Sequence, residues 1–428
     1  MRKIASAALA SLLLVTGAIA QTNQTASPRT VVRAGRLLDV KSGRMLASQD
    51  IVIEGERIVS FGPAGAAAPQ GARFIDLSKS TVLPGLIDAH VHLNWDPGDL
   101  GPIALTVSLP RQTLKGAKNA RVTLLAGFTT VRSMGADGYS DVALRDAIDA
   151  GEIPGPRILA SGPAICITGG HCDENMLPYE RRETSENSTD GPVGMERQVR
   201  EVVKFGGNVV KFMATGGVLS KGTDPRLTHM TPEEMRSVVA TAHGLGRKVA
   251  AHAHGNDGVA AAAAAGVDSV EHGHLMGDSA IAAMKQHGTY LVPTQYLLDW
   301  SIENMQKIDM PEYAQQKMRM VNQEGRKNFQ KALQAGVKIA FGTDAAVYPH
   351  GLNAREFGVY VKMGMTPIDA IRTATTNAAD LLGWADRVGS IEPGKFADLI
   401  AVDGDPLQDV TVLERVRFVM KGGTVMKQ

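Results

Sequence analysis

The sequence is short of cysteine and of net charge, and each shortage excludes a class of function. Its 428 residues include two cysteines, which are too few to build a zinc site from thiolates. Lysine and arginine number 45 against 44 acidic residues, so the basic surplus that attracts nucleic acid is missing. Any bound metal must therefore rely on histidine and oxygen ligands, and we expect no nucleic-acid partner.

Long hydrophobic runs are also scarce. After residue 20 no apolar run is long enough to cross a membrane, so we expect no stable membrane span. The first 20 residues combine the positive MRK, the apolar IASAALASLLLVTG and a small-residue AIA before Gln21, which predicts a signal peptide over 1–20. The protein would then be exported, periplasmic or secreted. In such an oxidising compartment Cys166 and Cys172 are free to pair, although their spacing alone does not require it.

The two ends of the chain differ from its middle in the pattern of apolar and polar residues. Residues 21–82 and 388–428 alternate apolar and polar side chains over short runs, and we expect both segments to build one small β-sandwich domain. Between them, residues 83–387 alternate short apolar strands with helices. Eight such strands favour an α/β fold, a (β/α)8 TIM barrel. The competing doubly wound sheet would carry a glycine-rich phosphate turn after its first strand, and LPGLIDAHVHLN has none.

Histidines gather in pairs at the ends of the expected strands. In LPGLIDAHVHLN, His90 and His92 are two residues apart and therefore point to the same side of an extended strand. Alone, this pair suits core packing as well as metal binding. Further strands carry polar residues in comparable places, namely His252, His254, His272, His274, Lys211 and Asp344. Because the strands of a barrel end at one mouth, these side chains would surround a single site.

Lys211 lies inside the apolar run NVVKFMA. Burial of a lone ammonium is costly, so such a lysine tends to lose its proton. A neutral amine can react with carbon dioxide to form a carbamate, whose two oxygens can bind cations. The alternative is a lysine whose long stem reaches solvent, and the histidine pairs are what favour a ligand.

These motifs resemble those of the amidohydrolase superfamily. The resemblance rests on LPGLIDAHVHL, VVKFMATGG, VAAHAHG, SVEHGH and FGTD, and on the flanking GSIEPGKFADLIAVDGDPL, so it covers nearly the whole chain after residue 20. TGGHC, MATGGVLSKGTDP and VPTQ are further similar to its prolidase-like, imidazolonepropionase-like and ochratoxin-hydrolysing members.

The resemblance implies two divalent metal ions, most often zinc. By position, His90, His92 and Asp344 would hold one metal, His252 and His272 the other, and a carbamate on Lys211 would bridge them. Two such cations acidify a bound water and polarise a carbonyl. Asp344 would also move the water's proton to the leaving amine. His171 and His254 would bind the developing oxyanion or a substrate carboxylate, and His274 would support the site or contact the substrate.

The same resemblance implies cleavage of an amide or peptide bond that releases a free C-terminal amino acid. The expected partner is thus a small-molecule amide or peptide, as for an Xaa-amino-acid dipeptidase or a carboxypeptidase, and ochratoxin A is a specific case. Tyr139, Lys221 and Arg226, from loops after strands, are candidates to read the substrate carboxylate. By analogy, we also expect a homo-oligomer.

Three other functions compete with this one. A cyclic amide or lactone hydrolase would use the same barrel, and so would a mononuclear deaminase. Deaminases of this superfamily have a glutamate three residues after the strand-five histidine and no strand-four lysine, whereas this chain has Gly255 and Lys211. The last alternative, a non-catalytic metal-binding protein, is opposed by the complete ligand set.

Overall fold

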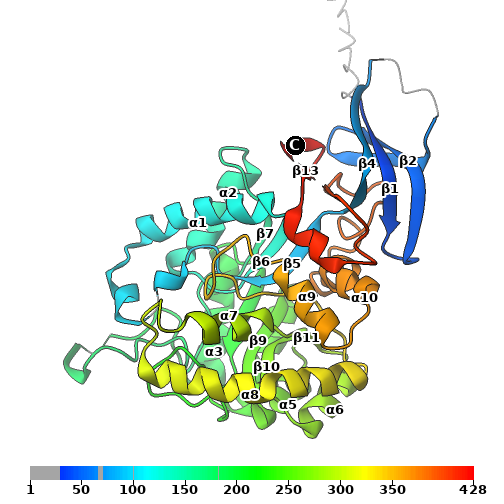
Figure 1. Ribbon diagram of the computed structural model, residues 1–428. Coiled ribbons are helices and arrows are strands. Elements are labelled where there is room, and N and C mark those ends of the chain that lie inside the picture. Colours follow the sequence, from blue (N-terminus) through cyan, green and yellow to red (C-terminus); the bar gives the residue numbers. More distant parts are fainter. Residues whose placement is uncertain (1–28, 66–70, 100, 182) are drawn as a thin grey trace, which may run out of the picture.

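Strands from both ends of the chain form one small sheet. The computed structural model describes residues 29–65, 71–99, 101–181 and 183–428, so the expected signal peptide lies outside the described residues. The sheet has the order β14-β13-β12-β4-β1-β2-β3 and projects from the rest of the molecule (Figure 1). Its strands are β1 (Arg29–Asp39), β2 (Arg44–Glu54), β3 (Arg57–Pro63), β4 (Arg73–Pro84), β12 (Leu399–Val402), β13 (Phe418–Lys421) and β14 (Thr424–Lys427).

The two chain ends meet where β12 pairs antiparallel with the end of β4, for example Ile400 with Leu83. Only β1 and β4 run parallel in this sheet. An apolar cluster that includes Val32, Ile51 and Leu399 packs within it. The described strands of the two ends thus pair as a single sheet, and the second layer of the expected sandwich stays a prediction.

The middle of the chain contains parallel strands separated by helices. One sheet has the order β5-β6-β7 and the other β11-β10-β9-β8, and every pairing in them is parallel. The strands are β5 (Leu86–Val91), β6 (Phe128–Ser133), β7 (Arg157–Ala160), β8 (Val209–Met213), β9 (Lys248–Gly255), β10 (Ser269–Leu275) and β11 (Tyr290–Val292). They are almost entirely buried, as strands covered on both faces should be.

Single bridges join these two parallel sheets. Ile165, just after β7, pairs with Phe212 of β8. On the other side, residues 338–345 pair with β11 through Ile339 and with β5 through Ala345. This last segment is the expected eighth strand, and it is held by isolated bridges instead of a regular ladder.

Helices follow most of the parallel strands and surround them (Figure 1). The longest, α8, runs along one side of the molecule. Among the described residues, no helix is long and apolar enough to span a membrane. The helices are α1 (Leu109–Leu125), α2 (Ser140–Asp149), α3 (Gly191–Lys204), α4 (Pro232–Gly244), α5 (Asn256–Ala265), α6 (Asp278–His287), α7 (Tyr296–Asn304), α8 (Glu312–Gln334), α9 (Arg355–Lys362), α10 (Pro367–Arg372) and α11 (Ala378–Leu381).

The expected first strand of the middle region, over 81–91, is divided between the two parts of the fold. Its first residues belong to β4 in the terminal sheet, and the rest form β5. Gly85 separates them, and a Cβ there would lie 2.1 Å from the Thr129 hydroxyl oxygen. Only a glycine allows this close approach of the chain to β6.

Candidate active site

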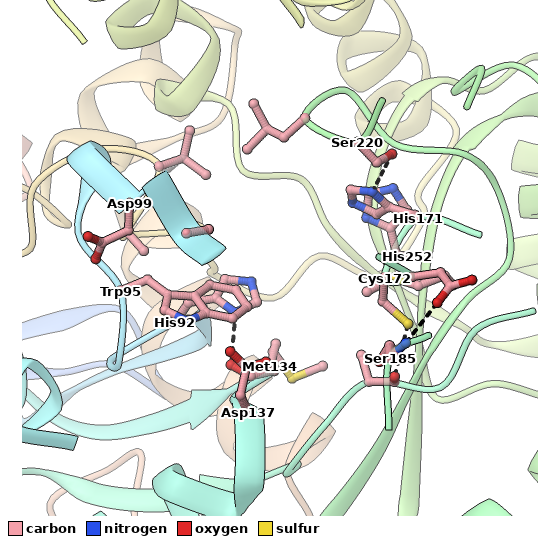
Figure 2. A pocket seen from close by; sticks show the side chains of 18 of the residues that line it. His92, Trp95, Asp99, Met134, Asp137, His171, Cys172, Ser185, Ser220 and His252 are labelled. Carbon is pink, nitrogen blue, oxygen red and sulfur yellow. Dashed lines mark hydrogen bonds between the residues drawn. The ribbon is translucent and has the colours of Figure 1, made fainter. Parts of the chain in front are cut away.

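A cavity of about 740 Å³ lies at the C-terminal ends of the parallel strands. Figure 2 shows His92, Trp95 and Asp99 on one side of it and His171, Cys172 and Ser220 on the other. Most of the predicted site residues line this cavity, namely His90, His92, His171, Lys211, Lys221, His252, His254, His272, His274 and Asp344. Residues as distant in the sequence as His90 and Asp344 are thereby brought together.

The tightest group consists of His90, His92 and Asp344. One Asp344 carboxylate oxygen lies 3.4 Å from Nε2 of His90 and 3.2 Å from Nε2 of His92. The ligand atoms of all three residues lie within 4.8 Å of one another, which suits a metal ion. Burial alone would raise the pKa of Asp344, but the two imidazoles outweigh it and hold that pKa well below the usual value. The carboxyl group is thus ionised, as a metal ligand must be.

His252, His272 and Lys211 lie beside this group. The imidazole of His272 is 4.9 Å from that of His90 and 4.7 Å from that of His252, measured between ring centroids. Nε2 of His252 is buried without a hydrogen-bond partner, which leaves it available as a ligand atom. Burial lowers the pKa of Lys211 to about 8. These residues therefore offer further nitrogen donors beside the group of His90, His92 and Asp344.

Two of these residues have backbones that side chains rarely tolerate. His272 has φ +72° and Asp344 has φ +58°, both in the left-handed region. Thr294, at φ +46°, bonds Nδ1 of His272 through its hydroxyl at 2.8 Å. Such conformations cluster at functional sites, where the surrounding structure imposes them.

Sequence reasoning gave no role to Glu271 and Arg132, which support His90. A Glu271 carboxylate oxygen lies 2.7 Å from Nδ1 of His90, so this nitrogen donates and Nε2 is left to face Asp344. Arg132 donates to the other oxygen of Glu271 at 2.8 Å, and both side chains are fully buried. A carboxylate that orients a histidine ligand in this way is typical of metal sites. The signal was available, since Glu271 is a charge inside an apolar strand, as Lys211 is.

The three remaining imidazoles of the cavity have different surroundings. The His171 ring lies 4.4 Å from that of His252, and desolvation, aided by nearby Lys211, lowers the pKa of His171 to about 3. His254 is buried with its Nδ1 unpartnered. Nε2 of His274 instead donates to the Pro293 carbonyl oxygen at 2.9 Å. His171 and His254 are thus free to contact a substrate, whereas His274 is occupied in tying two strand ends together.

The predicted carboxylate readers divide between the cavity and its surroundings. Lys221 lies at the edge of the cavity. Tyr139 does not line it, because its ring packs against Phe205 at 4.9 Å. Arg226 also lies outside the lining, and its guanidinium pairs with Asp224, two residues away in sequence, at 2.6 Å. Neither Tyr139 nor Arg226 is placed to touch a molecule in the cavity.

Acidic side chains gather toward the mouth of the cavity. Asp137, Asp173, Glu174, Glu183 and Glu186 all line it. Burial, followed by the charges of these neighbours, raises the pKa of Glu174 above its ordinary value. An entering group with negative charge would therefore be repelled there.

The two cysteines form a disulfide between Cys166 and Cys172, and no free cysteine remains. Cys172 lines the cavity, next to His171. The pairing that the sequence left open is thus present, and it closes the loop that carries a site histidine.

The site combines histidines, an aspartate and a buried lysine at the ends of parallel strands. These are the groups that a metal-assisted hydrolase uses. The amidohydrolase family matches residues 81–426, so this chain belongs to that family. Ochratoxinase of Aspergillus niger is 32% identical over 427 residues, which cover 93% of this chain and 86% of the relative. Imidazolonepropionase of Erwinia tasmaniensis is 25% identical over 404 residues, covering 85% of this chain and 89% of the relative.

Among solved structures, an Xaa-Pro dipeptidase with methionine bound in its active site is similar with a TM-score of 0.89. The two chains are 40% identical, and the match covers 94% of this chain and all of the other. These relatives support both the assignment to the family and the type of bond that is cleaved, an amide bond. The protein is a hydrolase that acts on amide bonds.

Proposed function

We propose that the protein is a binuclear metal-dependent amidohydrolase that removes a free C-terminal amino acid from a small amide or peptide. The observation that carries this proposal is the buried Lys211, which lines the same cavity as Asp344 and the imidazoles of His90, His252 and His272. A lysine in that place is explained by a carbamate that binds two cations. The names of the relatives, an ochratoxinase and an Xaa-Pro dipeptidase, supply the substrate class.

We further infer that the parallel strands close into a (β/α)8 barrel over residues 83–387. Backbone hydrogen bonds support closure on both sides, from Ile165 to Lys211 and from Ala89 to Phe341. The segments 21–82 and 388–428 would form the second domain. A homo-oligomer also remains part of the proposal, by analogy alone.

The side chains of this site have distinct tasks. Zinc or another divalent ion, when bound, would supply a water of lowered pKa and polarise the scissile carbonyl. His90, His92 and Asp344 would hold one ion, His252 and His272 the other, with the carbamate of Lys211 shared between them. One Asp344 oxygen lies 3.4 Å from Nε2 of His90 and 3.2 Å from Nε2 of His92, and this carboxylate would accept the water's proton and pass it to the leaving amine.

His171 and His254 would act on the substrate itself. Both line the cavity, and both have low imidazole pKa values because they are buried, so they are neutral at pH 7. A neutral imidazole N–H can donate to the developing oxyanion or to the carboxylate of the departing amino acid. Lys221, at the edge of the cavity, is the remaining cation there for a carboxylate at longer reach.

The acidic mouth favours one substrate type within this class. A dipeptide presents a positive ammonium on its acyl side, and Asp137, Glu174 and Glu183 would attract it. Ochratoxin A, cleaved to ochratoxin α and phenylalanine, carries no such cation, so it is the second candidate. Ochratoxin A stays a candidate substrate because the chain is related to an ochratoxinase.

The test compares dipeptides and N-acyl amino acids with their C-terminal amides, with ochratoxin A, and with lactones and cyclic imides. We expect free-carboxylate dipeptides to have the highest kcat/KM and amidated ones to lose about a hundredfold, since a charge-assisted hydrogen bond is lost. Equal cleavage of the amides would contradict the proposal. Exclusive cleavage of lactones or imides would assign the site to the alternative cyclic amide or lactone hydrolase. Two bound metals without turnover on any of these would indicate a binding protein.

A further inference from the structure

The loop that presents His171 has little regular structure of its own. Residues 166–172 lie between β7 and α3 and contain two exposed residues, Thr168 and Gly169. Inside the loop, one backbone hydrogen bond runs from Gly170 to the Ile167 carbonyl oxygen. An irregular segment of this kind samples many conformations unless a cross-link or contacts with its surroundings restrict them.

The disulfide supplies one such restriction. Cys166 is fully buried, and its backbone bonds to Asn187 and Thr189 hold it in the core. Cys172 follows His171 directly, so the bond between the two cysteines fixes the chain one residue from the imidazole. The loop is therefore anchored at both ends, and a single rigid ring carries His171.

The residues after β8 restrict the imidazole itself. Ser220 Oγ lies 2.9 Å from Nδ1 of His171, a contact that Figure 2 shows as a dashed line. The ring also lies flat against Gly217, where a Cβ would be only 2.1 Å from its Cε1 and 2.3 Å from its Nε2. With Nδ1 occupied by Ser220, Nε2 is left for the cavity, where the ring of His252 lies 4.4 Å away.

Helix α8 holds this second segment in place. Nζ of Lys317 donates to the carbonyl oxygen of Ser220 at 2.6 Å and to that of Gly217 at 3.1 Å. The hydroxyls of Ser220 and Thr223 lie 2.5 Å apart, and the Thr223 oxygen accepts from the backbone N–H of Gly217 at 3.2 Å. The serine that contacts His171 is thus itself fixed from two directions.

We propose that the Cys166–Cys172 disulfide and Ser220 are positioning elements that hold the His171 imidazole, with Nε2 toward the cavity, for its contact with the reacting amide. The proposal rests on the proposed function only in this last contact. Misplacement of a contacting group by about 1 Å can cost a hundredfold in rate, so a loop histidine needs such a clamp. Reduction of the disulfide would then slow turnover without removing any group from the site.

A double-mutant cycle separates positioning from general stability. The chain with Cys166→Ser and Cys172→Ser should lose about tenfold to a hundredfold in kcat, with two metals retained. In a His171→Ala background the same cysteine substitutions should change kcat less than twofold, because the group they position is already gone. Ser220→Ala should behave in the same way, and Ser220→Thr should restore part of the rate. Ser237→Ala, which removes an exposed hydroxyl bonded to the Pro192 carbonyl oxygen, is the matched control.

One measurement depends neither on turnover nor on a variant's ability to fold during synthesis, and a second applies a reductant to protein that has already folded. Nitrogen NMR of the His171 ring in chelated protein should show one fixed tautomer, which a phosphine reductant converts to an averaged signal. The reductant should slow the wild-type enzyme but not the double cysteine variant, and this difference excludes removal of metal as the cause. Gly217→Ala keeps the disulfide and should displace the ring, with the same dependence on His171.

The outcomes distinguish this inference from the proposed function. An unchanged His171 signal and full kcat after reduction would overturn the positioning role. Additive losses in the cycle would overturn it as well, since they indicate a stability effect unrelated to His171. If the wild-type enzyme cleaves none of the amides, the proposed function fails, and the NMR result still decides whether the disulfide positions His171.

Discussion

At the scale of residues, Lys211 is a base buried inside β8, only 2% exposed. Within the part of the chain that the structure describes, no carboxylate lies within ion-pair distance of it. We expect Lys211→Ala to bind fewer than two metals and to lose activity in step, because the bridging ligand is gone. Elemental analysis and kcat, measured on the same samples, check this.

Lys285→Ala is the matched control, since it removes an exposed lysine from α6. It should keep both metals and full rate, as solvated charges usually contribute little. A Lys211→Ala enzyme that also kept two metals and full turnover would show that the lysine is not a ligand.

Asp141 provides a pH-dependent prediction away from the metals. Its carboxylate accepts the backbone N–H groups of Val142 and Gly162, and burial nevertheless raises its pKa to about 6. The folded protein thus holds this proton more tightly than the unfolded chain, so the residue's contribution to stability falls as pH rises from about 4 to 6. Between pH 4.5 and 7.5 the loss should be about 2 kcal/mol, from the usual energy of a pKa shift.

The measurement is urea unfolding of the wild type and of Asp141→Asn at both pH values. Asparagine does not ionise, so the difference in unfolding free energy should shift in favour of the variant at pH 7.5. A difference that is independent of pH would contradict the raised pKa. Glu233→Gln, on the exposed side of α4, controls for the general effect of pH.

The position of a side chain could be predicted where it depends on residues close in sequence, and not where it depends on distant ones. His90 and His92 follow from the two-residue period of a strand, which is local. Tyr139 and Arg226 were predicted from their positions in loops after strands, yet contacts with Phe205 and Asp224 keep them out of the cavity. A loop side chain is placed by packing that a single sequence does not encode locally.

At the scale of elements, helix α4 begins with a capping box, for which the sequence TPEEM over residues 231–235 has the residues in the required order. Thr231 Oγ1 accepts from the Glu234 N–H, and the Glu234 carboxylate accepts from the Thr231 N–H at 2.7 Å. The same carboxylate also accepts from the N–H of Gly191, the first residue of α3, at 2.7 Å. Glu234 therefore ties two helices together, which the sequence pattern does not reveal.

Because Glu234 makes two contacts, its removal should lower the unfolding free energy more than removal of the Thr231 hydroxyl. Thr231→Ala should lower the unfolding free energy by about 1 kcal/mol, the usual value of an N-cap. Glu234→Ala should lower it by about 2 to 3 kcal/mol, since it removes two charge-assisted bonds. Chemical denaturation measures both, with Glu233→Ala as the exposed neighbour. If Glu234→Ala costs no more than Thr231→Ala, the contact with Gly191 contributes nothing.

Element boundaries were less predictable than element types. The stretch from Val82 to Ile87 contains no polar residue, and the close contact of Gly85 with Thr129 is what shows that it serves two sheets. The segment 338–345 carries the strand-like KIAF, yet isolated bridges at Ile339 and Ala345 hold it, and the backbone of Asp344 near its end is left-handed. In both places a tertiary contact, or the site itself, overrides the local pattern.

At the scale of the whole molecule, both ends of the chain return to one sheet. The β4–β12 pairing brings residues more than 300 positions apart into register. Alternation alone predicted strands at both ends, but a pairing so distant in sequence leaves no local signal. The disulfide could not be predicted from the sequence either, because the spacing of the cysteines only permits it and the fold brings them together.

The last prediction concerns export. We propose that residues 1–20 are removed after Ala20, since MRK, the apolar stretch and AIA have the order of a signal peptide. The Cys166–Cys172 disulfide supports an oxidising destination, because such bonds rarely persist in the cytosol. Intact-mass analysis of protein from its native host should find a chain that begins at or near Gln21. Without reduction its mass should be 2 Da lower than with it, since two thiol hydrogens are lost on pairing.

Ala18→Asp with Ala20→Asp provides the control, because acidic residues block the small-residue site that the peptidase reads. This variant should keep Met1 or stay in the cell, whereas the wild type is processed and released to the periplasm or medium. A mature wild-type protein that retains Met1 and has both thiols free would contradict export. The site would then operate in a reducing compartment. The disulfide would be reduced in the cell and would not position His171 there.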